Sequence, residues 1–312
     1  MLTGASGYVG GRLIPRLQSA GWDVHGIVRD PAPALGIEHT VCDLASEAAN
    51  GALAAACDGA EAVIHLAGEN EVVASARPAE ALASTVMATE RVAEACARAG
   101  TRRLIYVSTV HVYGARISPG AELSEEMRAE PRSAYAISRL ASEHVAAATS
   151  GQSYDLVTFR LTNSVGAPAD PAVNRWMLVA NDLCREGALT GRLTLRSSGT
   201  QWRDFVALSE VCSALVLAAD GAAHALPPGT YNLASGRATT VRTLAELIQE
   251  AFERETGERP TLRAPDPEPN PPGPYHVSVE RAARHGLRLA QRLADAVAET
   301  VRFCLEHREE LP

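Results

Sequence analysis

Short runs of β-branched and aliphatic residues alternate with longer alanine-rich segments over the first 165 residues of the chain. The short runs are five or six residues long, which suits buried strands, and the longer segments have helical patterns. This order is typical of βαβ units, in which a crossover helix joins two parallel strands. The sequence therefore predicts an α/β fold with a doubly wound parallel sheet. The expected strands lie at residues 23–28, 38–42, 62–67, 103–107 and 155–159.

The longest expected helix, residues 78–99, has a proline in its first turn and ends before Gly100. Proline suits the first turn because the amide hydrogen that it lacks would have no partner there, and glycine suits the position after a helix. A further helix is expected at residues 134–149. Both helices would serve as crossover connections of the sheet.

A glycine-rich turn, residues 3–10, opens the first helix. Glycines at this spacing let backbone N–H groups approach a pyrophosphate at the positive end of a helix. A tight turn that needs small residues is the alternative, but this turn begins a βαβ series, where the dinucleotide site of a Rossmann-type fold belongs. The expected cofactor contacts are Gly4, Ser6, Gly7, Tyr8, Val9 and Gly10.

Beyond Gly166 the regular alternation ends, and the chain predicts a smaller lobe. Seven prolines between residues 260 and 274 exclude regular structure, so this segment is an extended loop that could cover a cleft. We assign residues 1–165 to a dinucleotide-binding domain, to which residues 204–235 return. Residues 166–203 and 236–312 form a smaller C-terminal substrate-binding lobe. Its expected elements are a helix at 172–186, a strand at 193–196, a helix at 241–252 capped by Thr240, and a final helix striped by Leu289, Leu293, Val297, Val301 and Leu305. A further strand is expected at 230–233, within the returning segment.

The end of the second strand bears on the choice between NAD and NADP. An acidic residue there accepts the ribose hydroxyls of NAD, whereas an arginine accommodates the 2′-phosphate of NADP. The chain offers Arg29 followed by Asp30, which favours NADP slightly and leaves NAD open. After the third strand, Asp43 could accept from the adenine amine or cap a helix, and with Leu44 it is counted among the cofactor contacts.

Composition and charge exclude several classes of function. The 312-residue chain has a formal net charge of -8, whereas a nucleic-acid-binding protein presents a basic patch or stripe. The six cysteines are far apart, without a CxxC pair or a histidine spacing typical of a metal site, so we expect reduced thiols and no metal. No apolar run approaches the ~20 residues of a membrane span, and no signal peptide is evident. We therefore expect no membrane partner and a cytoplasmic location.

The first strand is unusually short, because only Met1 and Leu2 precede the turn that begins at Thr3. A central parallel strand normally has ~5 residues. Either the strand is truncated or the start of the chain was assigned late, and the late start is the preferred interpretation.

Tyr135 is the strongest candidate for acid/base chemistry. A tyrosine with its ordinary pKa of about 10 acts as a base near neutrality only if a fixed positive charge stabilises the phenolate. Arg139 stands one helical turn later and can provide that charge. Thr109, 26 positions before Tyr135, could hydrogen-bond the same substrate oxygen, as a hydride transfer at an alcohol carbon requires.

These motifs resemble those of the extended short-chain dehydrogenases/reductases, the family of NAD(P)-dependent sugar-nucleotide epimerases and dehydratases. The resemblance spans residues 1 to about 250. It rests on the glycine-rich turn, on His65-Leu66-Ala67-Gly68 at a strand end, on Ser108-Thr109 with Tyr113-Gly114, and on Tyr135 with a cation four residues later.

The resemblance implies a role for each of these residues. Tyr135 would be the catalytic base, Thr109 would align the substrate hydroxyl, and Arg139 would bind the nicotinamide ribose. The strand end would add Leu66, Ala67 and Gly68 to the cofactor contacts. The family ordinarily carries lysine at the position of Arg139, and arginine is planar and keeps its proton. Two alternatives to full activity therefore remain open: a lower activity, or a site that has taken on another role.

The second lobe continues the resemblance to sugar-nucleotide epimerases. In those enzymes the asparagine at the position of Asn163 contacts the nucleotide-sugar, and the arginine at the position of Arg203 binds its diphosphate. A second phosphate-binding arginine, frequent in the family, is absent, because residues 271–274 read Pro-Pro-Gly-Pro. Val110 and His111 stand where 4,6-dehydratases carry an Asp-Glu pair, so a dehydratase is not expected.

The resemblance leaves two activities on a nucleotide-linked sugar, 4-epimerase and 4-ketoreductase, with Arg29 favouring the reductase slightly. The alternatives are an NADPH-dependent reductase of a non-nucleotide ketone and a non-catalytic dinucleotide sensor. In this family the helix pair at residues 78–99 and 134–149 is a common dimer surface, so a homodimer is expected.

Overall fold

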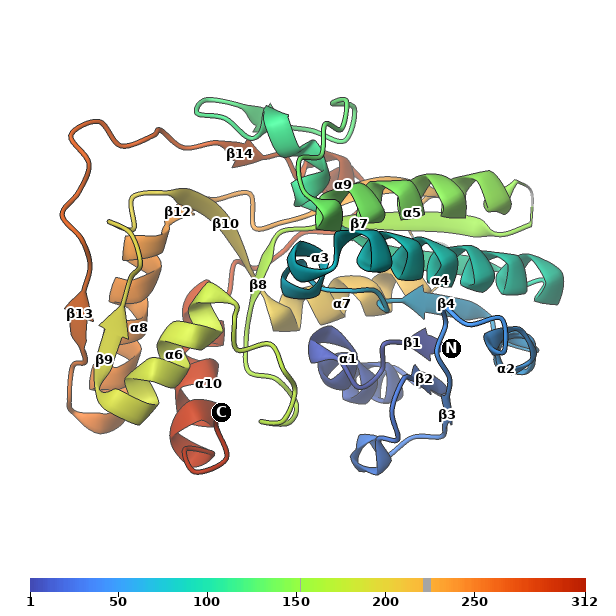
Figure 1. Ribbon diagram of the computed structural model, residues 1–312, viewed down its shortest axis with the longest axis horizontal. Coiled ribbons are helices and arrows are strands. Elements are labelled where there is room, and N and C mark those ends of the chain that lie inside the picture. Colours follow the sequence, from blue (N-terminus) through green and yellow to red (C-terminus); the bar gives the residue numbers. More distant parts are fainter. Residues whose placement is uncertain (152, 221–225) are drawn as a thin grey trace.

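A seven-stranded sheet forms the centre of the computed structural model, which describes residues 1–151, 153–220 and 226–312 (Figure 1). The strand order is β11-β7-β5-β4-β1-β2-β3, and all neighbouring strands run parallel. Because the order reverses at β1, this is the doubly wound Rossmann arrangement, and the predicted fold class is confirmed. The strands are β1 (Leu2–Thr3), β2 (Gly26–Val28), β3 (His39–Val41), β4 (Ala62–His65), β5 (Arg103–Thr109), β7 (Asp155–Leu161) and β11 (Gly229–Leu233).

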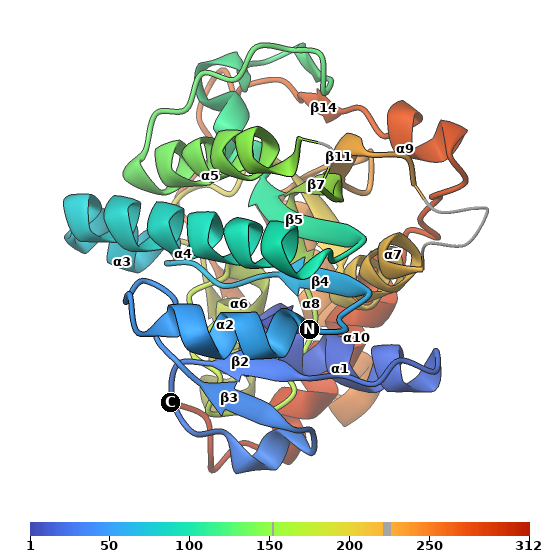
Figure 2. The same cartoon turned by 90° about the vertical axis from the view of Figure 1, so that its right-hand side faces the viewer.

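Helices cover both faces of this sheet (Figure 2). On one face α1 (Tyr8–Ser19) and α7 (Leu208–Ala219) pack against Ile64, Ile105 and Val157 through their buried aliphatic side chains. On the other face lie α2 (Ala49–Cys57), α4 (Pro78–Ala99) and α5 (Ala134–Ser150), and α4 and α5 run side by side. Both faces are therefore buried, which explains why the strands read as short, continuous apolar runs.

The remaining chain builds a smaller lobe beside the carboxyl ends of the large sheet, on the left in Figure 1. Its apolar core lies between three helices, a three-stranded sheet and a two-stranded sheet. The helices are α6 (Val179–Thr190), α8 (Val241–Thr256) and α10 (Leu293–Glu306). The strands are β8 (Asn163–Val165), β10 (Trp202–Ala207) and β12 (Ala238–Thr240) in one sheet and β9 (Arg192–Thr194) and β13 (Thr261–Arg263) in the other.

Short elements complete the fold. They are η1 (Pro33–Leu35), α3 (Glu71–Ala76), η2 (Val110–Arg116), β6 (Glu122–Leu123), β14 (His276–Val277) and α9 (Glu280–Arg284). Strands β6 and β14 pair with each other outside the large sheet. None of the helices in the described ranges combines the length and apolarity that a bilayer crossing requires.

The helix predicted at residues 172–186 is wrong in its first half, because α6 begins only at Val179. The preceding segment is held in an irregular path by side-chain hydrogen bonds to its own backbone. The Asp170 carboxylate accepts from the Ala172 N–H, and the Trp176 indole donates to the Pro171 carbonyl. These bonds compete with helix formation.

Two other expectations for the small lobe need correction. The proline-rich segment does contain regular structure, because strand β13 directly follows the first of its seven prolines and pairs with β9. The final helix does not reach back to Leu289, because Gln291 takes a left-handed conformation (φ 60°). The backbone N–H groups of Gln291 and Arg292 donate instead to the Glu210 carboxylate.

Residues 204–235 contribute to both sheets. Strand β10 belongs to the three-stranded sheet. Helix α7 packs on the large sheet, and β11 is its edge strand. Residues 221–225 of this segment lie outside the described residues. The division of the chain into two domains stays a prediction.

Candidate active site

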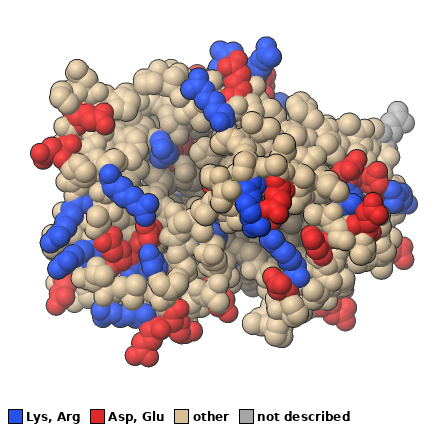
Figure 3. Space-filling model, viewed as in Figure 1, with Lys and Arg blue, Asp and Glu red and all other residues tan. Residues whose placement is uncertain are grey.

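A cavity of about 990 Å³ lies at the carboxyl ends of β1, β2, β4, β5 and β7. Open parallel sheets bind their ligands at this edge, where the strand order reverses. Figure 3 shows that this face of the molecule is hollowed near its middle, with side chains of both charges around the hollow. Every predicted site residue except Arg203 lines the cavity: Gly4, Ser6, Gly7, Tyr8, Val9, Gly10, Arg29, Asp43, Leu44, Leu66, Ala67, Gly68, Thr109, Tyr135, Arg139 and Asn163.

The glycine-rich turn is packed so tightly that a side chain at Gly10 would collide with the backbone and one at Gly7 would crowd it. A Cβ on Gly10 would lie 2.3 Å from the Gly4 carbonyl oxygen, and one on Gly7 would lie 3.1 Å from the same atom. Helix α1 begins directly after Gly7, which has no side chain to cap the first N–H groups. These free N–H donors form the positive end of the helix, which suits the binding of a pyrophosphate.

A chain of buried hydrogen bonds fixes the loop after β4. The Thr3 hydroxyl accepts from the two backbone N–H groups that follow His65 (both 3.2 Å), so its own proton goes to His65 Nδ1 (2.7 Å). His65 Nε2 then carries the ring proton and donates to Thr89 Oγ1 (3.0 Å), which donates to the Thr85 carbonyl. His65 is therefore a positioning residue with one defined tautomer, outside the cavity.

We expect His65 to remain neutral well into the acidic range. Burial above all, and then the charge of Arg139, lowers the pKa of His65 to about 3. Between pH 6.5 and 3 the unfolded chain therefore binds a proton that the folded chain does not, so this group lowers the free energy of unfolding by roughly 1.4 kcal/mol per pH unit as the pH falls. An NMR titration of the histidine rings checks this. A midpoint near 6.5 for His65 would contradict the burial argument.

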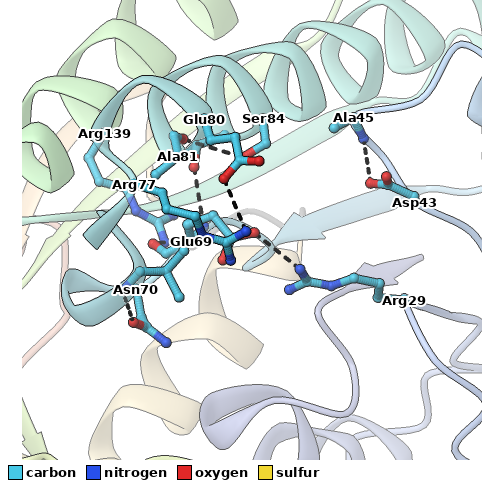
Figure 4. A network of polar contacts seen from close by, with 12 residues as sticks. Arg29, Asp43, Ala45, Glu69, Asn70, Arg77, Glu80, Ala81, Ser84 and Arg139 are labelled. Atoms are coloured by element: carbon cyan, nitrogen blue, oxygen red, sulfur yellow. Dashed lines mark hydrogen bonds and ion pairs between the residues drawn. The ribbon is translucent and has the colours of Figure 1, made fainter. Parts of the chain in front are cut away.

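At the end of the cavity beside β2 and β4, the loops after these two strands face each other through charged side chains (Figure 4). Arg29 Nη1 lies 3.1 Å from Glu69 Oε1. Asp43 accepts from the Ala45 N–H (3.0 Å) in the turn after β3, and the helix cap that was one of its two interpretations is wrong, because α2 begins only at Ala49. The Asp43 side chain also lines the cavity, which leaves the predicted adenine contact possible in space.

Tyr135 and Arg139 lie one turn apart at the start of α5. The guanidinium carbon of Arg139 is 5.4 Å from the centre of the Tyr135 ring. A Cβ on Gly68 would lie 2.9 Å from the Arg139 guanidinium and would displace it, and the φ of +150° at this position also favours glycine. Among the described residues, the buried Nε and Nη1 atoms of Arg139 have no hydrogen-bond partner. Such donors suit the ribose hydroxyls of a dinucleotide, so the residues present fit the cofactor that the fold implies.

Removal from water, more than the neighbouring charges, favours the protonated phenol of Tyr135. Burial raises the pKa of Tyr135 above its ordinary value, while Arg139 and Arg175 lower it and Glu71 raises it. The net direction is upward. A neutral phenol can donate a proton to a substrate oxygen, and the adjacent guanidinium can stabilise the phenolate that remains.

Thr109 ends β5 and is buried at the cavity wall, where its Oγ1 accepts from the His111 N–H (3.2 Å). Its own hydroxyl hydrogen is free to turn towards a ligand. The preceding residue, Ser108, donates to Glu143 Oε1 (2.5 Å), and Glu143 forms a buried ion pair with Arg160 (2.8 Å). A rigid polar layer thus lies beneath the strand end that carries Thr109.

The two predicted substrate-binding residues of the small lobe differ in position. Asn163 lines the cavity and its side-chain amide donates to the Asp204 carbonyl (2.9 Å). Arg203 does not line the cavity, because its guanidinium donates to the Trp202 carbonyl (2.8 Å) on the same strand. The pKa of His111 lies below its ordinary value mainly because of burial, and the nearby charge of Arg203 also lowers it whereas Glu71 raises it. The predicted diphosphate contact of Arg203 stays a prediction that requires its side chain to turn.

Sequence reasoning missed an ion pair that crosses the cavity. Glu71, at the start of α3, lies 3.3 Å from Arg175 of the small lobe, and both line the cavity. The His111 ring stands 6.4 Å from the Tyr135 ring, in an edge-on arrangement. The position of Glu71 shortly after the end of β4 could have marked it as a candidate site residue. Arg175 lies in an irregular segment before α6, where no sequence pattern marks it.

Comparisons with known proteins agree with this fold. A family model described as "NAD dependent epimerase/dehydratase family" matches residues 1–234. The chain is 36% identical over 171 residues to a dTDP-6-deoxy-L-talose 4-dehydrogenase (NAD(P)(+)) of Kitasatospora kifunensis, an alignment that covers 54% of this chain and 52% of the relative. It thus spans about half the length of that relative.

A second relative aligns over nearly the whole chain. The UDP-glucose 4-epimerase of Mycolicibacterium smegmatis is 28% identical, and the alignment covers 97% of each chain. Among solved structures, MoeE5 in complex with UDP-glucuronic acid and NAD superposes with a TM-score of 0.80 at 25% identity, over 99% of this chain and 98% of that one.

Proposed function

Because the chain belongs to the NAD dependent epimerase/dehydratase family, we propose that it is an NAD(P)-dependent enzyme that reduces a keto group at C4 of a nucleotide-linked sugar. The carrying observation is a half-buried Tyr135 that packs against Arg139 and lines one cavity together with Thr109 and the glycine-rich turn. The C4 position is supported by the names of the relatives, a 4-dehydrogenase and a 4-epimerase.

The residues of this chain divide the work of a reduction. A bound nicotinamide dinucleotide supplies the hydride. Thr109 holds the carbonyl oxygen by a hydrogen bond from its hydroxyl, and Tyr135 donates its phenolic proton to that oxygen as negative charge develops there. Arg139 stabilises the phenolate that remains, because its guanidinium is fixed beside the ring and stays charged. Solvent then returns the proton to Tyr135.

A 4-epimerase is the second candidate, and it is favoured by the relative that aligns over 97% of both chains. In that reaction Tyr135 first accepts the proton of the C4 hydroxyl, which requires a lower pKa than the present surroundings give it. Arg139 and Arg175 favour the phenolate that this step needs, whereas burial and Glu71 oppose it.

Calorimetric titration with NAD⁺, NADH, NADP⁺ and NADPH, alone and with UDP, TDP, GDP and CDP present, tests the proposal. We expect one reduced dinucleotide to bind and one nucleoside diphosphate to bind beside it. Tight binding of NAD⁺ with slow exchange would support the epimerase. The absence of any nucleotide response would favour a ketone that carries no nucleotide, and binding without turnover of any keto sugar would favour a sensor.

We also propose a homodimer that uses α4 and α5. The two helices lie side by side on one face of the sheet, and they leave large apolar side chains exposed at Leu82 (36%), Met87 (39%) and Ile137 (44%). Burial of such side chains stabilises an association of two copies. Light scattering of the purified chain is expected to give twice the mass of one chain, and the mass of a single chain would contradict the proposal.

A further inference from the structure

The ion pair between Arg29 and Glu69 spans the strand that leads into the glycine-rich turn. Arg29 follows β2 and Glu69 follows β4, and β1 lies between these strands, paired with both. The Nη1–Oε1 distance is 3.1 Å, and both residues line the cavity. Figure 4 shows the Arg29 side chain extended from its own loop to reach the carboxylate. The pair therefore connects two loops across the adenosine end of the predicted dinucleotide site.

Glu69 is the fixed partner and Arg29 the movable one. The Glu69 side chain is 19% exposed, whereas that of Arg29 is 66% exposed. The backbone of Glu69 is held on both sides, since its N–H donates to Thr85 Oγ1 (3.2 Å) and its carbonyl accepts from Arg139 Nη2 (3.4 Å). The guanidinium can leave the carboxylate, but the carboxylate stays beside the cavity.

We propose that Glu69 determines the coenzyme preference of this chain by competing for Arg29. The inference rests on the proposed function, in which a dinucleotide places its adenosine ribose at the end of β2. A 2′-phosphate of NADP must take the guanidinium from Glu69 and must approach a carboxylate of the same sign. The ribose of NAD carries only hydroxyl groups there and makes no such demand. Glu69 thus weakens the preference for NADP that Arg29 alone would give.

Glu69→Gln tests this inference, because glutamine keeps the shape of the side chain and removes its charge. We expect the Kd of NADPH, measured by calorimetry on the purified chain, to fall about three- to tenfold, the scale of one exposed charge pair plus one repulsion. The Kd of NADH should change less than about twofold. The gain for NADPH should shrink at high salt, because exposed charges are screened there.

Glu80→Gln is the matched control. Glu80 pairs with Arg77 (3.0 Å) close to Glu69, but neither residue of that pair lines the cavity. The control removes the same charge and should leave both Kd values unchanged. In a second test, Glu69→Gln should tighten NADPH binding clearly less when Arg29→Gln is also present, because there is then no guanidinium to release and only the repulsion between carboxylate and 2′-phosphate is removed.

Equal tightening of NADH and NADPH by Glu69→Gln, or no tightening of either, would overturn the inference and leave the proposed function intact. Tightening of NADPH binding by the same factor without Arg29 would overturn it as well, since the effect would then be repulsion alone. If the unaltered chain binds neither dinucleotide, the proposed function itself fails, and the inference fails with it.

Discussion

Replacing Tyr135 with phenylalanine is expected to lower kcat by about 10²–10⁴-fold, the usual contribution of a positioned general acid or base. The substitution removes only the phenolic oxygen, so the aromatic ring that packs beside Arg139 and His111 remains. The Kd of the dinucleotide should change little, because the predicted cofactor contacts of the glycine-rich turn are untouched. Steady-state turnover and calorimetry on the same preparation measure the two effects separately.

Two further variants show whether the loss belongs to this hydroxyl. Tyr231→Phe removes a phenolic oxygen that bonds the Pro227 carbonyl outside the cavity, and it should leave kcat unchanged. Arg139→Lys keeps the positive charge beside Tyr135 and should preserve or raise activity. Full turnover by Tyr135→Phe would exclude Tyr135 as the acid, and a large loss in Arg139→Lys would show that the planar guanidinium is specifically required.

The arginine at position 139 agrees with the composition of the whole chain. The sequence contains no lysine, so all 29 of its Lys and Arg residues are arginines. An arginine where the family ordinarily has lysine is therefore no sign that the site has lost its chemistry. The packing around Arg139 supports the same conclusion, because Gly68 leaves the space that the larger guanidinium needs. In Arg139→Lys the new side chain is the only lysine, so its ammonium group can be observed by NMR without overlap.

The sequence predicted the features that depend on short stretches of chain. Alternating apolar runs and helices gave the parallel sheet, because burial on both faces leaves a continuous apolar strand. The spacing of Gly4, Gly7 and Gly10 gave the first turn, because no side chain fits there. Tyr135 and Arg139 were predictable as a pair since one helical turn separates them.

Interactions between distant segments were not predictable in this way. Glu69 lies 40 positions from Arg29 and Glu71 lies 104 positions from Arg175, and no local pattern marks these partners. The irregular path before α6 was missed for a related reason, since Asp170 and Trp176 stabilise it through their own hydrogen bonds against the helical tendency of the segment.

The buried ion pair beneath the active-site strand is another contact of this kind. Glu143 of α5 and Arg160 of β7 meet at 2.8 Å, with side chains only 8% and 9% exposed. Burial opposes the charge on Arg160, but the hydrogen bonds and the charge of Glu143, together with Tyr113, outweigh that effect and raise the pKa of the guanidinium. The Ser108 hydroxyl also donates to Glu143, so the pair joins α5 to two neighbouring strands, β5 and β7.

Replacing Glu143 with glutamine is expected to lower the free energy of unfolding by about 3–5 kcal/mol. Glutamine preserves the shape but leaves the Arg160 charge buried without its counterion, and removal of one partner of a buried pair has a cost of this size. Urea denaturation followed by circular dichroism measures the loss. If Glu143→Gln does not accumulate as folded protein, its melting temperature with saturating dinucleotide present still provides the comparison.

The double variant Glu143→Gln, Arg160→Met separates the uncompensated charge from the lost contacts. It removes both charges, so it should be more stable than Glu143→Gln alone, as strongly coupled neighbours require. Glu280→Gln, in the exposed pair with Arg284 whose side chains are 72% and 73% exposed, should change the unfolding free energy by less than about 1 kcal/mol. A loss of under about 1 kcal/mol in Glu143→Gln as well would mean that Arg160 finds water or another partner. The pair would then not be the element that holds the strand of Thr109 in place.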